Sequence, residues 1–416
     1  MFDSSLLQQV RSCFAHVDSC PYQGERAFFE NAGGSLTLNS VVETTSRLAA
    51  IPDNQGRDNP ASHELVRLIN ESKRNIMTFL GTSRGMVFVG ESGTELLFRM
   101  IRAAVLAKDG NGDVLGSSLE HPATVSACRR WAGVANKNYI QIEHNPDTAM
   151  VTAEDYAAHV TPDTHVATII QTSPVSGTAL DVESIVKAVR AVSPNCFIVV
   201  DGIQHAAHGA LDLDAYNVDG FAVSAYKVFS KHNYGVAWLS ERLSTVPHDK
   251  LDGTADDFWE MGTRDTSAYA TFTDVVNYLE WLGSEFTTSD DLRDRLVAAG
   301  KAMQAHEHDL VQLMINGDET QSGLRDIEGV FIVGGADNPH REGLVSMTLV
   351  NMPSAEVVTA LNDRGIRTHV RKNDYFSGNI LNPLNMETCV RVSLCHYNSP
   401  AEVKKFLALV EELAST

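Results

Sequence analysis

The sequence predicts an α/β protein with a large domain, built on a mostly parallel seven-stranded sheet flanked by helices, and a smaller C-terminal α+β domain. Three observations carry this prediction. Seven short apolar runs rich in β-branched residues lie between residues 86 and 240. Helical patterns separate several of these runs, which is the alternation typical of a parallel sheet. After about residue 265 the pattern changes to long helices and a few strands.

The seven apolar runs are expected to be strands buried on both faces. Most of them are continuously apolar rather than alternating, as happens when helices cover both sides of a sheet. In chain order the expected strands are residues 86–89, 113–118, 139–142, 166–171, 197–201, 220–224 and 236–239.

Amphipathic helices are expected before and between these strands. Residues 63–81 carry apolar side chains at helical spacing and end at Gly81, a residue type that often terminates helices. Residues 95–107 and 182–192 likewise gather their apolar side chains on one side. Such helices can cover the sheet with one face and meet solvent with the other.

The C-terminal part is expected to form the smaller domain. A long helical region is predicted over about residues 267–316, and the elements after it are strands at 330–335 and 344–350, a helix at 354–364, a strand at 389–395 and a helix at 400–413. This pattern divides the chain into an N-terminal segment packing on the small domain, a large domain and a small domain, with bounds 1–30, 31–290 and 291–416.

Composition and charge exclude several function classes. The formal net charge is −20, which argues against nucleic acid and anionic membranes as partners, because both are polyanions. No apolar run approaches the roughly 18 residues of a membrane span, and the N-terminus does not resemble a signal peptide. The six cysteines are scattered without a C-x-x-C pair, as reduced thiols are. A cytoplasmic location is therefore expected.

An acid and a lysine follow two different predicted strands. Asp201 ends the run at 197–201, and Lys227 lies just beyond the run at 220–224. Ligands of open α/β sheets bind beyond the carboxyl ends of the strands, so both side chains can face one ligand. Pyridoxal phosphate (PLP) needs such a pair: an amine condenses with its aldehyde, and a carboxylate keeps its ring nitrogen protonated. Taken singly, Asp201 could as well be a helix N-cap. Lys227 taken singly fits an exposed loop lysine better.

Other residue types complete a PLP site. Gly93 and Thr94 begin a helix directly after a strand, where free N–H groups favour a phosphate, although Thr94 equally suits a helix N-cap. His121 can stack on the ring and move a proton, or be an ordinary loop histidine. Arg391 suits a substrate carboxylate, the alternative being a surface arginine on a strand.

Metal and nucleotide sites are not expected. His205 and His208 form an H-x-x-H pair, but no H-E-x-x-H or paired-cysteine motif accompanies them. Neither G-x-x-x-x-G-K-[ST] nor G-x-G-x-x-G after a strand occurs, which disfavours a nucleotide-dependent dehydrogenase.

Together these residues resemble the class V aminotransferase-like family of fold type I PLP-dependent enzymes. Within it the chain looks like the cysteine desulfurase-like branch, with isopenicillin N epimerase-type proteins as further relatives. The similar segments, in order, are residues 28–35, 90–98, 119–124, 172–178, 200–213, 224–235, 259–265 and 390–403.

The resemblance implies a cofactor role for individual residues. Lys227 carries PLP as a Schiff base, Asp201 pairs with the pyridine nitrogen and Gln204 bonds the phenolate oxygen. His121 stacks on the ring. The residues implied to hold the phosphate or otherwise contact the cofactor are Gly93, Thr94, Ser173, Ser224 and Tyr226. The large domain, residues 31–290, is then the PLP-binding domain.

The resemblance also implies a substrate site and a partner. Arg391 takes the carboxylate of an amino-acid substrate, and Asn31 belongs to an N-terminal active-site segment. Thr263 reaches the phosphate in the neighbouring subunit, so the chain is expected to be a homodimer.

Three departures from the family pattern bear on the reaction. Pro174 stands where many members have asparagine, so Ser173 or Ser176 takes over that contact or the contact is absent. Desulfurases use a loop cysteine to accept sulfur, and the matching loop at 368–382 contains none. The family phrase Gly-Pro-His after the lysine is replaced by Ser230, Lys231 and His232.

The expected function is therefore a PLP-dependent lyase or transferase acting on an amino acid. Cα deprotonation to a quinonoid comes first, with Lys227 as base. Elimination or bond-forming cyclase chemistry in specialised metabolism follows. A cysteine desulfurase or C–S lyase and an amino-acid epimerase are the alternatives. A non-catalytic PLP-fold binding protein is disfavoured, because both Lys227 and Asp201 are present.

Overall fold

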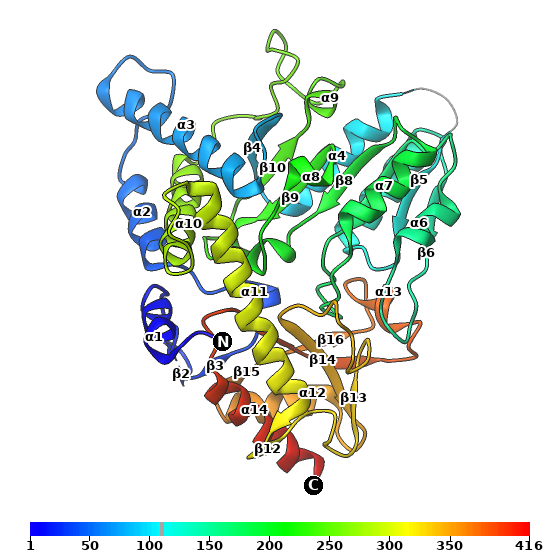
Figure 1. Ribbon diagram of the computed structural model, residues 1–416. Helices are drawn as coiled ribbons and strands as arrows, with labels where there is room; N and C mark the ends of the chain where they lie inside the picture. Colours follow the sequence, from blue (N-terminus) through cyan, green and yellow to red (C-terminus); the bar gives the residue numbers. More distant parts are fainter. Residues whose placement is uncertain (109–111) are drawn as a thin grey trace.

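The computed structural model describes residues 1–108 and 112–416. Figure 1 shows a large layer of strands and helices above a smaller sheet that lies close to the C-terminus. The long helix α11 (Leu292–Asn316) runs from the first part to the second. Within the described residues, no helix is both long and apolar enough to cross a membrane.

The large part contains the predicted seven-stranded, mostly parallel sheet, which confirms that prediction. Its strand order is β4-β10-β9-β8-β7-β5-β6. Strand β10 runs antiparallel to both of its neighbours, and the other strand pairs are parallel. In sheet order the bounds are β4 Met86–Gly90, β10 Gly235–Leu239, β9 Gly220–Ser224, β8 Phe197–Asp201, β7 Val166–Ile170, β5 Val114–Ser117 and β6 Tyr139–Ile142.

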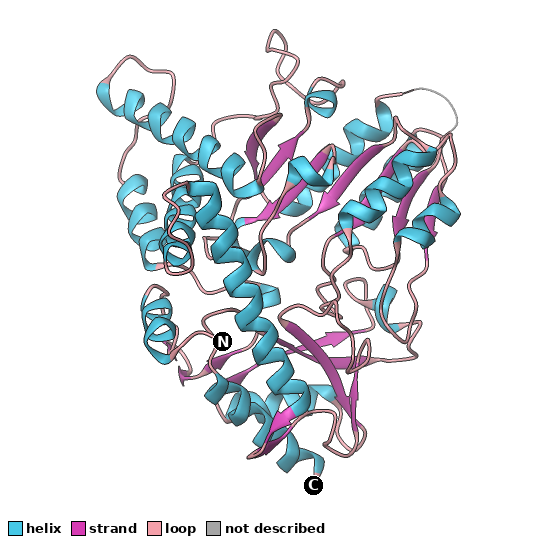
Figure 2. Ribbon diagram, in the orientation of Figure 1, coloured by secondary structure: helices cyan, strands magenta, loops and turns pink. Residues whose placement is uncertain are grey.

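Helices cover both faces of this sheet (Figure 2). Successive residues of β8 show the two faces, because Ile198 packs in a core with α7 (Val182–Val192), whereas Val199 packs in another core with α4 (Gly93–Leu106). Burial on both sides explains the continuous apolar runs of the sequence. The other helices before residue 250 are α2 Asn39–Ala49, α3 Pro60–Leu80, α5 Pro122–Val134, α6 Ala153–His159, α8 Leu213–Tyr216 and α9 Glu241–Ser244.

The helical region expected over residues 267–316 is present and consists of two helices. Helix α10 (Thr266–Ser284) ends before α11 begins. Along α11, Met303 belongs to the large core and Met314 to the core of the small domain. One helix therefore serves both cores and ties the two parts together.

The small domain is an antiparallel sheet with the strand order β13-β14-β17-β16, covered by helices. This confirms the predicted smaller α+β part. Its elements are β13 Val330–Ile332, β14 Leu344–Leu349, α12 Ser354–Asp363, β16 His369–Lys372, α13 Gly378–Leu381, β17 Thr388–Ser393 and α14 Pro400–Ala414.

The first thirty residues contact both parts of the molecule, since Phe14 packs edge-on against Phe229 in the large core whereas other residues contact the small domain. Strand β3 (Ala27–Phe28) pairs in parallel with β15 (Ile366–Arg367). In α1 (Ser4–Ser12), Nη1 of Arg11 donates to the carbonyl of Tyr397 over 2.6 Å. The domain bounds at residues 30 and 290 stay predictions. Two small hairpins complete the described strands, β1 Ser19–Cys20 with β2 Gly24–Glu25 and β11 Gly317–Asp318 with β12 Gln321–Ser322.

Candidate active site

The carboxyl end of β8 carries the buried acid that the sequence singled out. Asp201 is only 4% exposed, and its Oδ1 accepts a hydrogen bond from the Ile203 N–H over 3.1 Å. Burial raises the pKa of Asp201 to about 6, while the Ile203 N–H and the positive charge of Lys227 work in the opposite direction. A buried acid in such a place prefers a cationic or proton-donating partner.

Lys227 lies beyond the end of the neighbouring strand, in the 3-10 helix η3 (Ala225–Lys227). Its Nζ donates to Oε1 of Gln204 over 3.5 Å. Burial lowers the pKa of Lys227 to about 8, with further lowering by the charges of Arg391 and Arg371 and opposition from Asp201. The structure thus brings the predicted lysine and acid close enough for each charge to act on the other.

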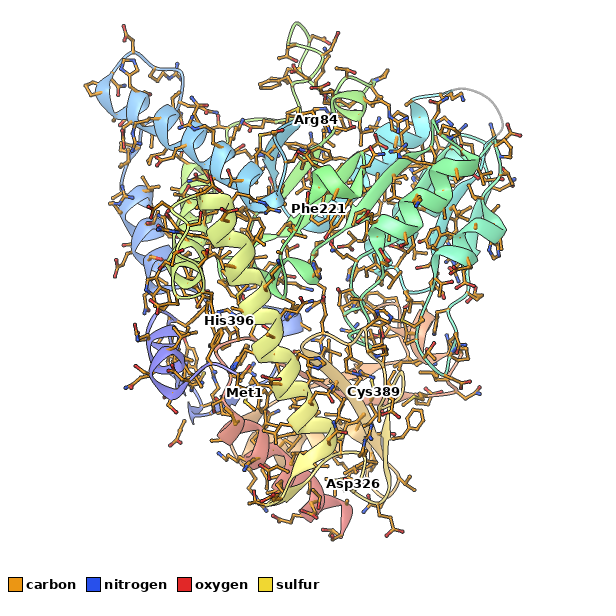
Figure 3. All side chains as sticks on the ribbon, in the orientation of Figure 1. Met1, Arg84, Phe221, Asp326, Cys389 and His396 are labelled. Carbon is orange, nitrogen blue, oxygen red and sulfur yellow. The ribbon has the colours of Figure 1, made fainter. Side chains whose placement is uncertain are left out.

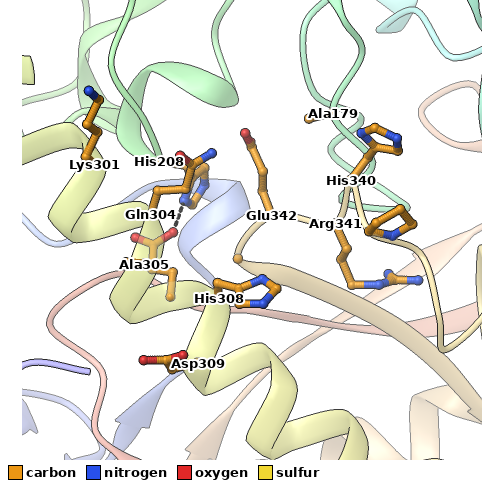
Figure 4. Close-up of a pocket in the computed structure, with 13 residues that line it drawn as sticks. Ala179, His208, Lys301, Gln304, Ala305, His308, Asp309, His340, Arg341 and Glu342 are labelled. Carbon is orange, nitrogen blue, oxygen red and sulfur yellow. Dashed lines mark hydrogen bonds and ion pairs between the residues drawn. The ribbon is translucent and has the colours of Figure 1, made fainter.

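A buried chain of polar groups stands behind Gln204. Its Nε2 lies 3.1 Å from Nε2 of His208, whose Nδ1 lies 2.6 Å from the carboxylate of Glu307. Burial alone would lower the pKa of His208, but the Glu307 carboxylate outweighs burial and raises it. His208 and Glu307 also line a pocket of about 440 Å³, together with Glu342 and residues of α11 (Figure 4). This series of hydrogen bonds fixes the position of Gln204 beside Lys227.

His208, Glu307 and Cys395 form a buried cluster whose donor atoms lie within 4.8 Å of one another. Two features favour a hydrogen-bonded pair over a metal site. His208 and Glu307 already bond directly over 2.6 Å. Burial also raises the pKa of the Cys395 thiol well above its usual value, whereas a metal needs the thiolate.

A helix N-terminus approaches the same end of the sheet. Helix α4 begins at Gly93, and the hydroxyl of Ser92 caps it by accepting from the Glu95 N–H over 3.2 Å. Ser92 is therefore the N-cap, and the alternative that Thr94 caps the helix is wrong. A Cβ at Gly93 would lie 2.5 Å from Oγ of Ser224, so glycine permits the close approach of α4 to the end of β9. The N-terminus of α4 and the Ser224 hydroxyl therefore lie together where an anion is favoured, whereas Thr94 is exposed and its contact with a phosphate stays a prediction.

His121 is the N-cap of α5 and lies near enough to Lys227 and Arg371 for their charges to act on it. Its Nδ1 accepts the Ala123 N–H over 3.1 Å, so the neutral ring carries its proton on Nε2. Burial, followed by the charges of Lys227 and Arg371, lowers the pKa of His121 to about 4. The ring is neutral at pH 7 and its Nε2–H is a donor. Stacking of His121 on a cofactor stays a prediction.

Arg391 reaches the site from β17 of the small domain and is only 3% exposed. Its Nη1 donates to the carbonyl of Pro174 over 3.1 Å, and its Nε is buried with no hydrogen-bond partner among the described residues. Burial, then the charge of Arg371, lowers the pKa of Arg391 to about 10. Ser173 braces the same turn, since its Oγ accepts the N–H groups of Val175 and Ser176 over 3.3 and 3.2 Å.

Asn31 and Tyr226 mainly hold neighbouring segments together. The Nδ2 of Asn31 donates to the Ser393 carbonyl over 2.7 Å, and Tyr397 donates to its Oδ1. The ring of Tyr226 stacks on His232 with centroids 4.5 Å apart. Direct contacts of Asn31 with substrate, and of Ser173 and Tyr226 with cofactor, stay predictions.

Thr263 is exposed in the segment before α10 and contributes no group to the cluster around Lys227. Its neighbour Arg264 forms an ion pair with Glu91, just before α4. The segment therefore lies near the predicted phosphate end.

Sequence reasoning missed two site residues. Glu120 is buried beside Asp201, accepts the Ile170 N–H over 2.9 Å and has its pKa raised to about 8 by burial and then by the charge of Asp201. Its position directly before His121 was the available signal. Arg371, whose charge acts on Lys227, His121 and Arg391, lies in the loop at 368–382 that lacks the desulfurase cysteine.

Known proteins resemble this chain along nearly its whole length. The model of the Aminotransferase class-V family matches residues 27–406. The chain is 24% identical to the cysteine desulfurase-like protein ustD of Aspergillus flavus, over 98% of this chain and 91% of that protein. It is also 24% identical to the nonribosomal peptide synthetase-like enzyme fsqF of Aspergillus fumigatus, over 93% of this chain and 26% of that protein.

A solved structure supports the fold. The apo cysteine desulfurase of Thermococcus onnurineus superposes with a TM-score of 0.82 and 20% identity, over 98% of both chains. At this identity the likeness concerns the fold alone. The expected relation to isopenicillin N epimerase-type proteins stays a prediction.

Proposed function

The chain belongs to the class V aminotransferase family, which is PLP-dependent, and we propose that it acts on an amino acid by removing the Cα proton. The reaction then continues by elimination or by bond formation, without a persulfide relay. The likeness to a nonribosomal peptide synthetase-like enzyme favours a place in specialised metabolism. The observation that carries the proposal is the placement of half-buried Lys227 and buried Asp201 beyond neighbouring strand ends, where each charge acts on the other.

The residues at this edge of the sheet fit PLP. Lys227 would hold it through its amine, and the buried carboxylate of Asp201 matches a protonated ring nitrogen. The close approach of Gly93, at the N-terminus of α4, to Ser224 places backbone N–H groups and a hydroxyl at the same end of the sheet, which suits a phosphate. Bound PLP supplies an electron-accepting ring that stabilises negative charge on the substrate Cα.

The protein side chains bind the substrate and handle its proton. Arg391 matches an α-carboxylate, because a buried guanidinium without an acidic partner attracts an anion strongly. Lys227 is suited to take the Cα proton, since its lowered pKa of about 8 leaves a substantial neutral fraction near pH 7 to 8. Neutral His121 can donate from Nε2 at the same time.

Desulfuration is the second candidate, because relatives carry that name, and the cysteines argue against it. A persulfide relay needs an accessible thiolate near the substrate. Among the described residues, Cys128, Cys196, Cys389 and Cys395 are buried, while Cys13 and Cys20 are half-buried in the N-terminal segment. The loop at 368–382 has no cysteine.

A homodimer belongs to the same proposal. Thr263 is exposed, so it is available to a second subunit, where it would contact the phosphate. A mass measured by light scattering should equal two chains of 45.3 kDa. A monomer that binds PLP and turns over amino acids at full rate would contradict this role of Thr263.

Spectral screening tests the proposed function. Purified protein loaded with PLP should be yellow, and a set of amino acids should change its absorption in a way that requires Lys227. A sulfide-release assay with cysteine separates the two candidates. Rapid release of sulfide through a protein persulfide would overturn the proposal in favour of desulfuration.

A further inference from the structure

Two arginines occupy one face of the small-domain sheet. Arg371 on β16 lies opposite Cys389, and Arg391 on β17 lies opposite His369. Opposed residues share a face, and so do residues two apart along a strand. Arg371 and Arg391 are therefore diagonal neighbours on one face, with Cα atoms typically about 7–8 Å apart in such pairs.

These two cations have no anionic partner within the described residues. Neither guanidinium is within 4.0 Å of a carboxylate, in contrast to Arg367, which pairs with Glu30 over 3.1 Å. Glu30 also pairs with His369 over 3.3 Å, so it is already engaged. The side chain of Asp374 accepts the Phe376 N–H over 2.8 Å, and its charge acts on Arg371 only from beyond ion-pair distance.

The loop after β16 fixes Arg371 without neutralising it. Nε of Arg371 donates to Ser377 Oγ over 2.7 Å, and Nη2 donates to the Phe376 carbonyl over 3.1 Å. The loop is in turn anchored to the large domain, because Nδ2 of Asn379 donates to the carbonyls of Ser118 and Glu120 over 2.6 and 3.0 Å. This anchor lies immediately before His121. Arg371 thus lies between the small-domain sheet and the residues of the large domain that precede His121.

Like charges held near each other disfavour the ligand-free site and favour binding of a ligand with matching negative charges. Lys227, Arg371 and Arg391 present three positive groups, and none of them forms an ion pair within 4.0 Å with any described residue. Asp201 opposes Lys227, while Glu30 acts on Arg391 and Asp374 on Arg371 from greater distances. One α-carboxylate satisfies Arg391 and leaves Arg371 unmatched.

We propose that Arg371 binds a second acidic group and that the substrate is an amino acid with a side-chain carboxylate, such as an aspartate-like or glutamate-like compound. This inference rests on the proposed function and names its substrate class. The α-carboxylate meets Arg391, and the side-chain carboxylate meets Arg371 on the neighbouring strand. Planar guanidinium groups suit both, because each can form paired hydrogen bonds with a carboxylate.

The test compares acidic amino acids with their amides. PLP-loaded protein is titrated with L-aspartate, L-asparagine, L-glutamate and L-glutamine, and the dissociation constant is read from the change in cofactor absorption. At least one acid should bind about ten- to one-hundredfold more tightly than its amide. Arg371→Gln should remove this preference, so that the acid and its amide bind with similar dissociation constants.

Two further variants serve as controls. Lys372 is exposed on the same strand and points to the other face, so Lys372→Gln should keep the preference for the acid. Arg371→Lys keeps a charge and should retain part of the preference, which separates lost charge from a disturbed loop.

The outcomes distinguish this inference from the proposed function. If acids and amides bind equally to the unchanged protein, or if Arg371→Gln keeps the preference, the role of Arg371 is wrong. If no amino acid alters the absorption, or if the protein does not bind PLP, the proposed function itself fails.

Discussion

The large domain and the small domain each form one wall of the site, and the two walls differ in how their charges are compensated. On the large-domain wall, Lys227 bonds Gln204 and faces Asp201, while His208 is paired with Glu307. On the small-domain wall, Arg391 and Arg371 face the same space with only carbonyl and hydroxyl partners. A wall with internal partners suits a group that stays bound, whereas a wall of unmatched cations suits an anion that arrives and leaves.

The largest expected effect comes from replacing Lys227 on the large-domain wall. Lys227→Ala should reduce turnover at least about 1,000-fold, because the amine that would hold the cofactor and move the proton is gone. Circular dichroism should show the fold unchanged. Lys231 is a matched control, since its amine pairs with Asp265 instead, and Lys231→Ala should remain active. Sustained turnover by Lys227→Ala contradicts the assignment.

Stability should also separate the two walls. His208→Leu leaves the Glu307 carboxylate buried without its partner, which should lower the free energy of unfolding by about 3–5 kcal/mol. Arg391→Met removes a buried cation that has no acidic partner, so its free energy of unfolding should equal or exceed that of the unchanged protein. Urea denaturation of both variants measures the difference. A loss for Arg391→Met as large as that for His208→Leu would show that both walls are equally compensated.

Substitution of Arg391, which is not expected to lower stability, should weaken substrate binding. Arg391→Lys keeps a charge but loses the paired geometry of the guanidinium, and loss of a charge-assisted hydrogen bond is worth about 1.5–3 kcal/mol. KM for amino acids should therefore rise about ten- to one-hundredfold, with cofactor content unchanged. If PLP is lost instead while KM stays the same, Arg391 serves the cofactor and not the substrate.

The smallest expected effect is a shift in the pKa of Lys227, on the large-domain wall, when Arg391 of the small-domain wall is replaced. Lys227 attacks an aldehyde only when neutral, so covalent capture of PLP by the cofactor-free protein should speed up as pH rises through about 8. Since Arg391 lowers the pKa of Lys227, Arg391→Gln should move this midpoint to higher pH. Absorbance measured after mixing with PLP at different pH values gives the midpoint. A midpoint near ~10.4, the value of an ordinary lysine, would mean that Lys227 is not desolvated.

Much of the large domain was predictable from sequence because burial leaves a local pattern. Strands covered on both faces are continuously apolar, and residues at their carboxyl ends share one edge, which brought Asp201 and Lys227 together in the prediction. Gly81 was predictable as a helix end, because glycine adopts the left-handed conformation easily, and its φ is indeed 68°.

The unpredicted features depend on pairings that the sequence does not display. Arg371 and Arg391 become neighbours only through the register of β16 with β17. His208 and Glu307 are 99 residues apart and meet only because α11 crosses the back of the site. The break between the two helices within residues 267–316 was not predicted, although the polar run at 287–291 marks it and Asp291 caps α11.

Chemical trapping of the cofactor tests the central claim most directly. Borohydride reduction of PLP-loaded protein turns a lysine–cofactor linkage into a stable amine, and peptide mass spectrometry then identifies the labelled lysine. The account predicts one phosphopyridoxyl group per chain, on Lys227, with the label absent from Lys227→Ala. A label on Lys231 or another lysine, or no label in a PLP-saturated protein, would contradict it.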